Sequence, residues 1–237
     1  AGGQPLLPTM KQRLAAPSDL VDLSKIDGLS GIEVDGKSVK IGAMTTHAEV
    51  ASHAGLRAVC PAICDMGGWI GDPHVRHRGT IGGSIANNDP AADYPSAMRA
   101  LGATIHTDQR EIAADDFFTG MFDTALNEGE IITAVSFTAP EKCAYEKFRN
   151  PASRYAMAGV FVAHHGDAVR VGVTGASSGG VYRPAHMEEA LSGNFSADAL
   201  DGCAVDEGDM LADIHGSAEY RAHLVKVMAK RAVADAH

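Results

Sequence analysis

The sequence predicts an α+β protein made of two domains. Segments in which apolar and polar residues alternate, as they do in strands, are interleaved along the chain with amphipathic stretches that are typical of helices. The chain has 237 residues, of which 45% are hydrophobic, and this is enough for one large domain or two smaller ones with cores of their own. Pro140 follows a strand-like segment, and we place the domain boundary there, with domains over residues 1–139 and 140–237.

The expected elements of the first domain are delimited by turn and capping residues. Asp35-Gly36 is a hairpin turn within residues 31–44, and Thr46 with Glu49 forms a capping box that opens a helix. That helix is expected to run to about His53, with Gly55 at its C-terminal end. The other expected elements are a helix over 56–68 that Gly67-Gly68 stops, a loop over 78–95, a short helix over 94–102, a hairpin with strands over 103–107 and 111–114, and a strand over 130–137.

The second domain is expected to begin with strands and to end with two helices. A strand over 144–149 precedes a hairpin over 157–176, which turns at His165-Gly166-Asp167. A helix over 183–193 has Pro184 in its first turn and Gly193 past its end. The last helix, within 216–236, is capped by Ser217 and has an apolar side formed by Tyr220, Leu224, Val227, Met228 and Ala232.

Charge and cysteine content narrow the classes of function. The net charge of −10, from 20 Lys and Arg against 30 Asp and Glu, argues against a nucleic-acid scaffold. No apolar run approaches the ~20 residues of a membrane helix. The four cysteines are too few and too scattered for a disulfide scaffold, so we expect reduced, mostly buried thiols and, by default, a cytoplasmic location.

Two glycine pairs, Gly2-Gly3 and Gly82-Gly83, stand out as candidate ligand-binding segments. Glycine pairs let the backbone approach a ligand closely, and successive N–H groups in such turns can bind an anion. Neither segment matches the fingerprint of a nucleoside triphosphate loop or of a Rossmann fold. The polar residues beside the second pair, among them Ser84 and Asp93, suit the hydroxyl groups of a nucleotide with a polyol. Taken singly, each pair is also consistent with an ordinary turn.

Several motifs together carry a resemblance to a known family. In chain order they are AGGQPLLPTMKQRL, IGDPHVRHRGTIGGSIANNDPAADYP, GEIITAVSF, YEKFRNPASRYAMAGV and DIHGSAEYRAHL. The chain resembles, over nearly its whole length, the FAD-binding medium subunit of molybdenum hydroxylases, a family that includes aerobic carbon monoxide dehydrogenases and relatives of xanthine dehydrogenase. The resemblance implies a two-subdomain FAD-binding fold of the p-cresol methylhydroxylase and vanillyl-alcohol oxidase type. A smaller C-terminal α+β domain of the carbon monoxide dehydrogenase type, an antiparallel sheet with helices, would follow it.

The resemblance also implies a set of cofactor-binding residues. The FAD diphosphate would lie against the first motif, at Ala1, Gly2, Gly3, Gln4, Pro5 and Leu6. The second motif would contribute Thr80, Gly82, Gly83, Ser84 and Ala86, together with Asp93. Ile70 and Gly71 would lie beside the flavin, and Ile132 would make an apolar contact from its strand. Lys147 matches a lysine that approaches the isoalloxazine, where a positive charge would stabilise the anionic reduced flavin. Without the resemblance, Lys147 would be interpreted as a solvated strand lysine.

The implied function is electron transfer within a larger enzyme. A large subunit would carry the molybdopterin cofactor, a small subunit would carry two [2Fe-2S] clusters, and FAD on this chain would pass electrons to a quinone, NAD or another acceptor. The expected assembly is a dimer of heterotrimers in the cytoplasm, with peripheral attachment at the inner face of the membrane as an alternative. No side chain of this chain is expected to act as a catalytic acid, base or nucleophile, and no metal site is expected in it.

Some positions depart from the family pattern. Pro5 stands where the family usually has Ser, which removes a backbone donor and a hydroxyl near the phosphate, and His74 and His77 replace residues that are more often Gln and Asn. The family also has a strand that precedes the first motif, so we expect a fragment or an incomplete gene product. Two alternative functions stay open at this point: a self-sufficient flavin oxidase of the vanillyl-alcohol type, and a degenerate assembly subunit without FAD.

Other clusters of polar residues are weaker candidates for a functional site. His164 and His165 point to opposite sides of their strand, so they are a poor chelate. Asp115-Asp116 is interpreted as a helix start and Glu188-Glu189 as a solvated helix face. The run 177–180, Ser-Ser-Gly-Gly, lacks the pattern of a nucleophile elbow and is expected to be a turn.

Overall fold

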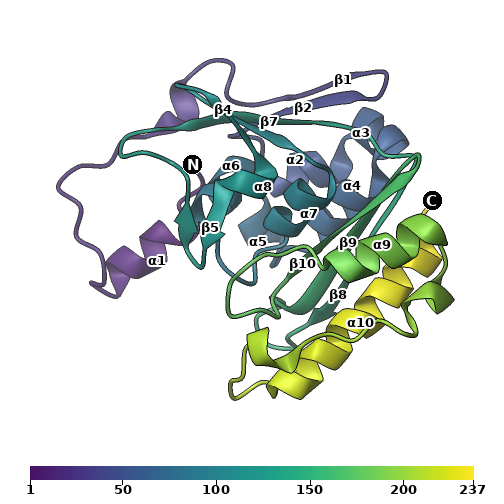
Figure 1. The fold of residues 1–237 in the computed structure, drawn as a ribbon. Helices are drawn as coiled ribbons and strands as arrows, with labels where there is room; N and C mark the ends of the chain where they lie inside the picture. The colour runs from purple at the N-terminus through teal and green to yellow at the C-terminus, as the bar shows by residue number, and fades with distance from the viewer.

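A computed structural model describes all 237 residues and confirms a mixed architecture of helices and sheets (Figure 1). The α-helices are α1 Leu6–Lys11, α2 His47–Ser52, α3 Ala54–Val59, α4 Pro61–Gly68, α5 Pro73–Arg76, α6 Ile81–Asn87, α7 Tyr94–Ala100, α8 Ala114–Phe117, α9 Ala185–Gly193 and α10 Ala218–Asp235. Short 3-10 helices are η1 Leu23–Lys25, η2 Ala197–Leu200 and η3 Glu207–Asp209. No helix combines the length and the hydropathy of a membrane span.

The strands form three antiparallel sheets. They are β1 Ile32–Asp35, β2 Ser38–Gly42, β3 Thr104–Thr107, β4 Glu111–Ala113, β5 Phe118–Gly120, β6 Asp123–Thr124, β7 Ile132–Thr138, β8 Lys142–Arg149, β9 Ala156–His165 and β10 Ala168–Thr174. The first sheet has the order β1-β2-β7-β3-β4, the second has the order β10-β9-β8, and β5 and β6 pair with each other. In the first sheet, Ile41 and Ile105 both pair with Val135, so β-branched side chains meet across its centre.

The molecule is layered, with helices on both faces of the second sheet (Figure 1). Helices α4 and α7 lie between the two larger sheets and contact β8, β9 and β10 on one side, while α9 and α10 cover the other side. One core of 32 buried residues fills the space around the inner helices, and a second core of 20 lies under α9 and α10. Because both faces are covered, residues 156–163 of β9 are all buried, and the strand does not alternate.

Most elements expected from the sequence are confirmed, and local chemistry explains them. The hairpins of β1 with β2, β3 with β4, and β9 with β10 form as predicted. The capping box is present: the Glu49 N–H donates to Thr46 Oγ1 at 3.2 Å, and the Thr46 N–H donates to Glu49 Oε2 at 2.7 Å. Ser217 caps α10 by accepting a hydrogen bond from the Tyr220 N–H at 3.2 Å.

Several details of the expected elements are wrong. The helix expected over 56–68 is two helices, because Pro61 begins α4 and Cys60 is not helical. Gly55 lies inside α3 and does not end the preceding helix. Residues expected to form a loop include α6. Helix α9 begins after Pro184 and includes Gly193. Tyr220 is 40% exposed and is not part of the apolar core.

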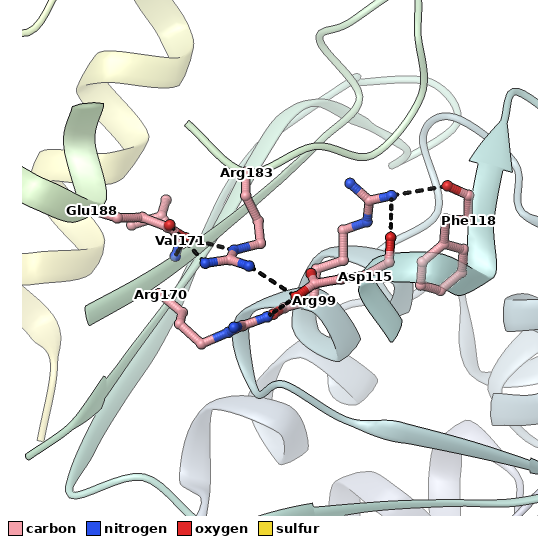
Figure 2. Close-up of polar contacts among 7 residues, drawn as sticks. All are labelled: Arg99, Asp115, Phe118, Arg170, Val171, Arg183 and Glu188. Atoms are coloured by element: carbon pink, nitrogen blue, oxygen red, sulfur yellow. Dashed lines mark hydrogen bonds and ion pairs between the residues drawn. The ribbon is translucent and has the colours of Figure 1, made fainter. Parts of the chain in front are cut away.

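A charged network joins helices under the first sheet to the second sheet (Figure 2). The Asp115 carboxylate accepts hydrogen bonds from Arg170 at 2.7 Å and from Arg183 at 2.9 Å. Arg183 also binds both oxygens of Glu188 at 2.7 Å, and Glu188 Oε1 accepts the Val171 N–H at 2.8 Å. The expectation of a solvated Glu188 is therefore wrong. We call Asp115, Arg170 and Arg183 the inter-sheet clamp.

The cysteines are unpaired, as predicted, and Cys60, Cys64 and Cys143 are buried. The Sγ atoms of Cys60 and Cys143 lie 3.7 Å apart, so this contact also connects the α3–α4 junction to β8. Burial is the main reason that the pKa of Cys64 is raised to about 11. That thiol is therefore protonated and unreactive at neutral pH.

Candidate cofactor-binding site

A cavity of about 760 Å³ brings the two glycine pairs together. It is bounded by the N-terminal segment on one side and by the region around α6 on the other, with lining residues in 1–7, 20–23, 78–80, 83–87 and 89–93, and with Thr9, His47, Ile70, Val75 and Tyr155. Its volume falls in the range of roughly 300–1,000 Å³ that is typical of small-molecule and cofactor sites.

Most of the residues expected at the cofactor line this cavity. They are Ala1, Gly2, Gly3, Gln4, Pro5, Leu6, Ile70, Thr80, Gly83, Ser84, Ala86 and Asp93. Gly71, Gly82, Ile132 and Lys147 do not line it. Gly71 follows Ile70 directly, Ile132 is a core residue at the start of β7, and Lys147 is buried behind Asp93.

The first glycine pair supplies free backbone donors. The N–H groups of Gly2, Gly3 and Gln4 donate to no acceptor in the protein. Gly2 packs directly on the Arg78 carbonyl, where any Cβ would overlap that peptide, so the first motif contacts the second only if this residue is glycine. Pro5 is the N-cap of α1, a position at which its missing N–H costs the helix no hydrogen bond.

The second glycine pair does not form the expected anion-binding turn. The N–H groups at the start of α6 are already used: Ile81 donates to Thr45 at 3.0 Å, Gly82 donates to Ala43 at 2.9 Å, and Gly83 donates to Thr80 Oγ1 at 3.2 Å. A Cβ on Gly82 would overlap Ala43, so this glycine allows close packing between α6 and the residues after β2. Helix α6 contributes side chains to the cavity, and the side chains of Ser84 and Asn87 have no hydrogen-bond partner in the protein.

A buried ion pair lies at the wall of the cavity. Lys147 Nζ lies 2.9 Å from Asp93 Oδ1 and 3.1 Å from Oδ2, and it donates to the Trp69 carbonyl at 3.3 Å. The Lys147 side chain is 0% exposed and the Asp93 side chain is 6% exposed. The Tyr145 hydroxyl also donates to Asp93 Oδ1. Lys147 is therefore not a solvated strand lysine.

The other charged and polar lining groups are mixed in sign. Arg78 lines the cavity and is in no ion pair, whereas Lys11 and Arg76 do not line it. Burial raises the pKa of Asp89. Burial lowers the pKa of His47 to about 4, so its ring is neutral at pH 7, and its Nδ1 atom is buried without a partner.

Sequence reasoning missed part of the lining. Leu20, Val21 and Leu23 come from a segment without helical or strand periodicity, which gives no local signal for a wall of a cavity. Tyr155, 52% exposed, follows a turn in which Arg154 has φ of +64° and donates to the Gly71 carbonyl at 3.1 Å. This turn is visible only in the fold, because the residues around Tyr155 carry no local sequence signal for it.

The lining chemistry fits a dinucleotide-type cofactor such as FAD. Free amides of the first motif and Arg78 suit a diphosphate, the hydroxyl and amide groups of Ser84 and Asn87 suit a polyol, and the apolar lining residues suit a ring system. The unpartnered Nδ1 of His47 is consistent with a site that a ligand completes. No group of three or more His, Cys, Asp or Glu side chains is arranged to hold a metal ion.

Comparisons with known proteins agree with this chemistry. A family model described as the FAD binding domain in molybdopterin dehydrogenase matches residues 1–140. The nicotine 6-hydroxylase medium subunit of Paenarthrobacter nicotinovorans is 36% identical, covering 100% of this chain and 88% of the relative. The carbon monoxide dehydrogenase medium chain of Afipia carboxidovorans is 38% identical, covering 98% and 86%. A structure of reconstituted CO dehydrogenase from Oligotropha carboxidovorans matches with a TM-score of 0.89 and 36% identity, covering 99% of this chain and 87% of the matched chain.

Proposed function

This chain belongs to the family of FAD-binding domains in molybdopterin dehydrogenases, and on that premise we propose that it is the FAD-carrying electron-transfer subunit of a molybdenum hydroxylase. The observation that carries the proposal is that the two glycine motifs, whose glycine pairs are 79 or more residues apart in the chain, meet around one cavity. Free amides, free hydroxyl groups and apolar walls are the groups that the parts of FAD require.

The residues of this chain bind and orient the cofactor. When bound, FAD supplies one-electron and two-electron redox chemistry that no side chain can supply. The amides of Gly2, Gly3 and Gln4 would hold the diphosphate, with Arg78 as the nearby cation. Ser84 and Asp93 would accept or donate hydrogen bonds along the polyol, and Ile70 with Tyr155 would exclude water from the ring.

The proposal includes partners and an assembly. A large molybdopterin subunit and a small iron-sulfur subunit would bind this chain in a dimer of heterotrimers, and the relatives' names, "medium subunit" and "medium chain", support a multi-subunit enzyme. Four unpaired cysteines support a reducing compartment, the cytoplasm, with attachment at the inner face of the membrane as a variant. The proposed division is 1–139 for FAD binding and 140–237 for the C-terminal domain, supported by the family match to 1–140.

The substrate of the complex is selected outside this chain. The two relatives are named for nicotine and for carbon monoxide, yet they are 36% and 38% identical to this chain. Nearly equal similarity to subunits of enzymes with such different substrates is expected if the medium subunit handles electrons only.

The direct experiment is isolation of the full-length protein from its native host through a tag. We expect two co-purifying chains, iron and molybdenum in the complex, and a visible spectrum with flavin and iron-sulfur bands. A yellow protein without partners and without iron would favour a self-sufficient flavin oxidase. A colourless protein that does not take up added FAD would contradict the proposal and favour an assembly role.

A further inference from the structure

The buried Lys147 contacts acceptors of its own chain only, and this limits what it can do for a cofactor. An ammonium group has three donors, and its neighbours are Asp93 Oδ1, Asp93 Oδ2 and the Trp69 carbonyl oxygen. The side chain is 0% exposed and does not line the cavity. Lys147 therefore makes no direct contact with a ligand in the cavity, and its contact with the cavity wall is through Asp93, which does line the cavity.

Tyr145 is placed on the same side of the same strand. Residues 145 and 147 of β8 are two apart and share a face, which is the face that packs against the first core. The Tyr145 hydroxyl reaches Asp93 Oδ1 because Gly159, on the neighbouring β9, has no side chain; a Cβ there would overlap that hydroxyl. Burial raises the pKa of Tyr145, so the hydroxyl stays protonated and donates to the carboxylate.

The contacts with Tyr145 and Lys147 leave the Asp93 carboxylate able to accept a further hydrogen bond. Asp93 Oδ1 accepts from Tyr145 and faces Lys147, whereas Lys147 is the one protein donor near Oδ2. A carboxylate has about four acceptor positions. A buried carboxylate also needs a paired cation and hydrogen bonds to remain charged, and Lys147 and Tyr145 supply these.

We propose that Tyr145 and Lys147 are positioning residues that hold Asp93 as an oriented anion, so that its Oδ2 atom accepts a hydrogen bond from the polyol of the cofactor. This inference rests on the proposed function, because it assumes that FAD occupies the cavity. It assigns Lys147 to the charge and orientation of Asp93 rather than to direct contact with the ring. Tyr145 is a residue for which neither the glycine motifs nor the strand pattern predicts a role in binding.

The test is a double-mutant cycle on FAD affinity in the full-length, flavin-free protein. FAD is titrated into the wild type, Tyr145→Phe, Asp93→Asn and the double variant, with quenching of flavin fluorescence as the signal. Tyr145→Phe is expected to weaken FAD binding roughly tenfold to a hundredfold, as for loss of a hydrogen bond to a charged group. In the Asp93→Asn background the same change should have less than a twofold effect, because Tyr145 acts through Asp93.

Two further measurements separate positioning from a merely structural role. Tyr182→Phe is the matched control, because it removes a hydroxyl that is buried, has no partner and lies outside this cavity, and it should leave the affinity within twofold of wild type. The visible circular dichroism of bound FAD should change in Tyr145→Phe and not in Tyr182→Phe. Should Tyr145→Phe fail to fold, Lys147→Met in the same cycle gives the same prediction.

The outcomes are distinguishable. Wild-type protein that does not bind FAD contradicts the proposed function itself. Wild-type protein that binds FAD, with Tyr145→Phe unchanged or weakened only as much as Tyr182→Phe, overturns the inference alone. A Tyr145→Phe penalty that persists in full in the Asp93→Asn background also overturns it, because the hydroxyl would then act independently of the carboxylate.

Discussion

At the scale of single residues, His47, which lines the cavity, should make the stability of the protein depend on pH. Its pKa is lowered from 6.5 to about 4, mainly by burial and then by the charge of Arg76. Between these values the unfolded chain binds a proton that the folded chain does not, so the free energy of unfolding decreases as the pH falls from about 6.5 to 4. The loss for this one group is up to about 3 kcal/mol.

Urea denaturation of the flavin-free protein at several pH values measures this effect. In His47→Asn the slope of the unfolding free energy between pH 6.5 and 4 should be smaller than in the wild type. Replacing His223, an exposed histidine of α10 outside the cavity, with Asn is the control and should leave the slope as it is. Equal slopes in the wild type and in His47→Asn would contradict the burial argument.

Arg78 is the unpaired cation of the cavity, and its removal should weaken FAD binding. Arg78→Ala is expected to raise the dissociation constant about fivefold at low ionic strength and less at high salt, because its charge is exposed and screened. Lys11→Ala removes an exposed cation that does not line the cavity, and its effect should be under twofold. Equal, salt-independent effects of the two changes would argue against a diphosphate next to Arg78.

Some residues at the cavity can be predicted from local sequence signals, and others cannot. The residues of the first motif line the cavity, and glycine next to glycine is a local signal of a segment that a ligand can approach closely. The packing role of Gly82 has no local signal, since its contact with Ala43 joins segments far apart in the chain. His47 and Tyr155 reach the cavity only through the fold, so their own neighbours in sequence carry no sign of it.

At the scale of elements, the start of α6 depends on the absence of a side chain at position 82. A Cβ there would overlap both the backbone and the side chain of Ala43, so Gly82→Ala should destabilise the protein by about 1–3 kcal/mol through overpacking. Gly68→Ala is the matched control: it changes a helical glycine whose Cβ would lie 3.8 Å from Ala51, an ordinary contact. Its effect should be neutral, or stabilising by up to about 1 kcal/mol.

Thermal and urea unfolding of the two variants check this prediction. Equal stability of Gly82→Ala and Gly68→Ala would show that α6 and the residues after β2 are not packed as described.

The elements themselves were mostly predictable because their signals are local. Hairpin turns and the capping box of Thr46 with Glu49 specify their own geometry within a few residues. The errors came where two local signals compete. Pro61 interrupts a continuous apolar pattern, and in α6 a short helical run lies among residues that usually form turns.

At the scale of the whole molecule, the inter-sheet clamp connects the two halves. Asp115 accepts from two arginines of the second half, while the adjacent Asp116 has no ion pair. Asp115→Asn should lower the free energy of unfolding by about 1 kcal/mol, a modest value because the Asp115 side chain is 41% exposed. Asp116→Asn should change it by less than half as much.

High salt should reduce the difference between the two variants, because it screens partly exposed charges. Identical unfolding midpoints for Asp115→Asn and Asp116→Asn at low salt would show that the clamp does not hold the halves together.

The arrangement of the helices and sheets in layers could not be predicted from the sequence alone. The continuous apolar run over 156–163 is typical of a strand that is covered on both faces, but it does not say which helices cover it. The contacts of α4 and α7 with the second sheet join residues from opposite sides of Pro140, and long-range packing of that kind leaves no periodic pattern.

Whether the cavity between the two glycine motifs holds FAD can be decided by releasing and identifying the flavin of the native, full-length protein. Acid precipitation followed by chromatography and mass spectrometry of the supernatant gives both the identity and the amount. We expect FAD, released without covalent attachment, at one molecule per chain. A protein that releases no flavin and takes up none, or that releases FMN in place of FAD, would contradict it.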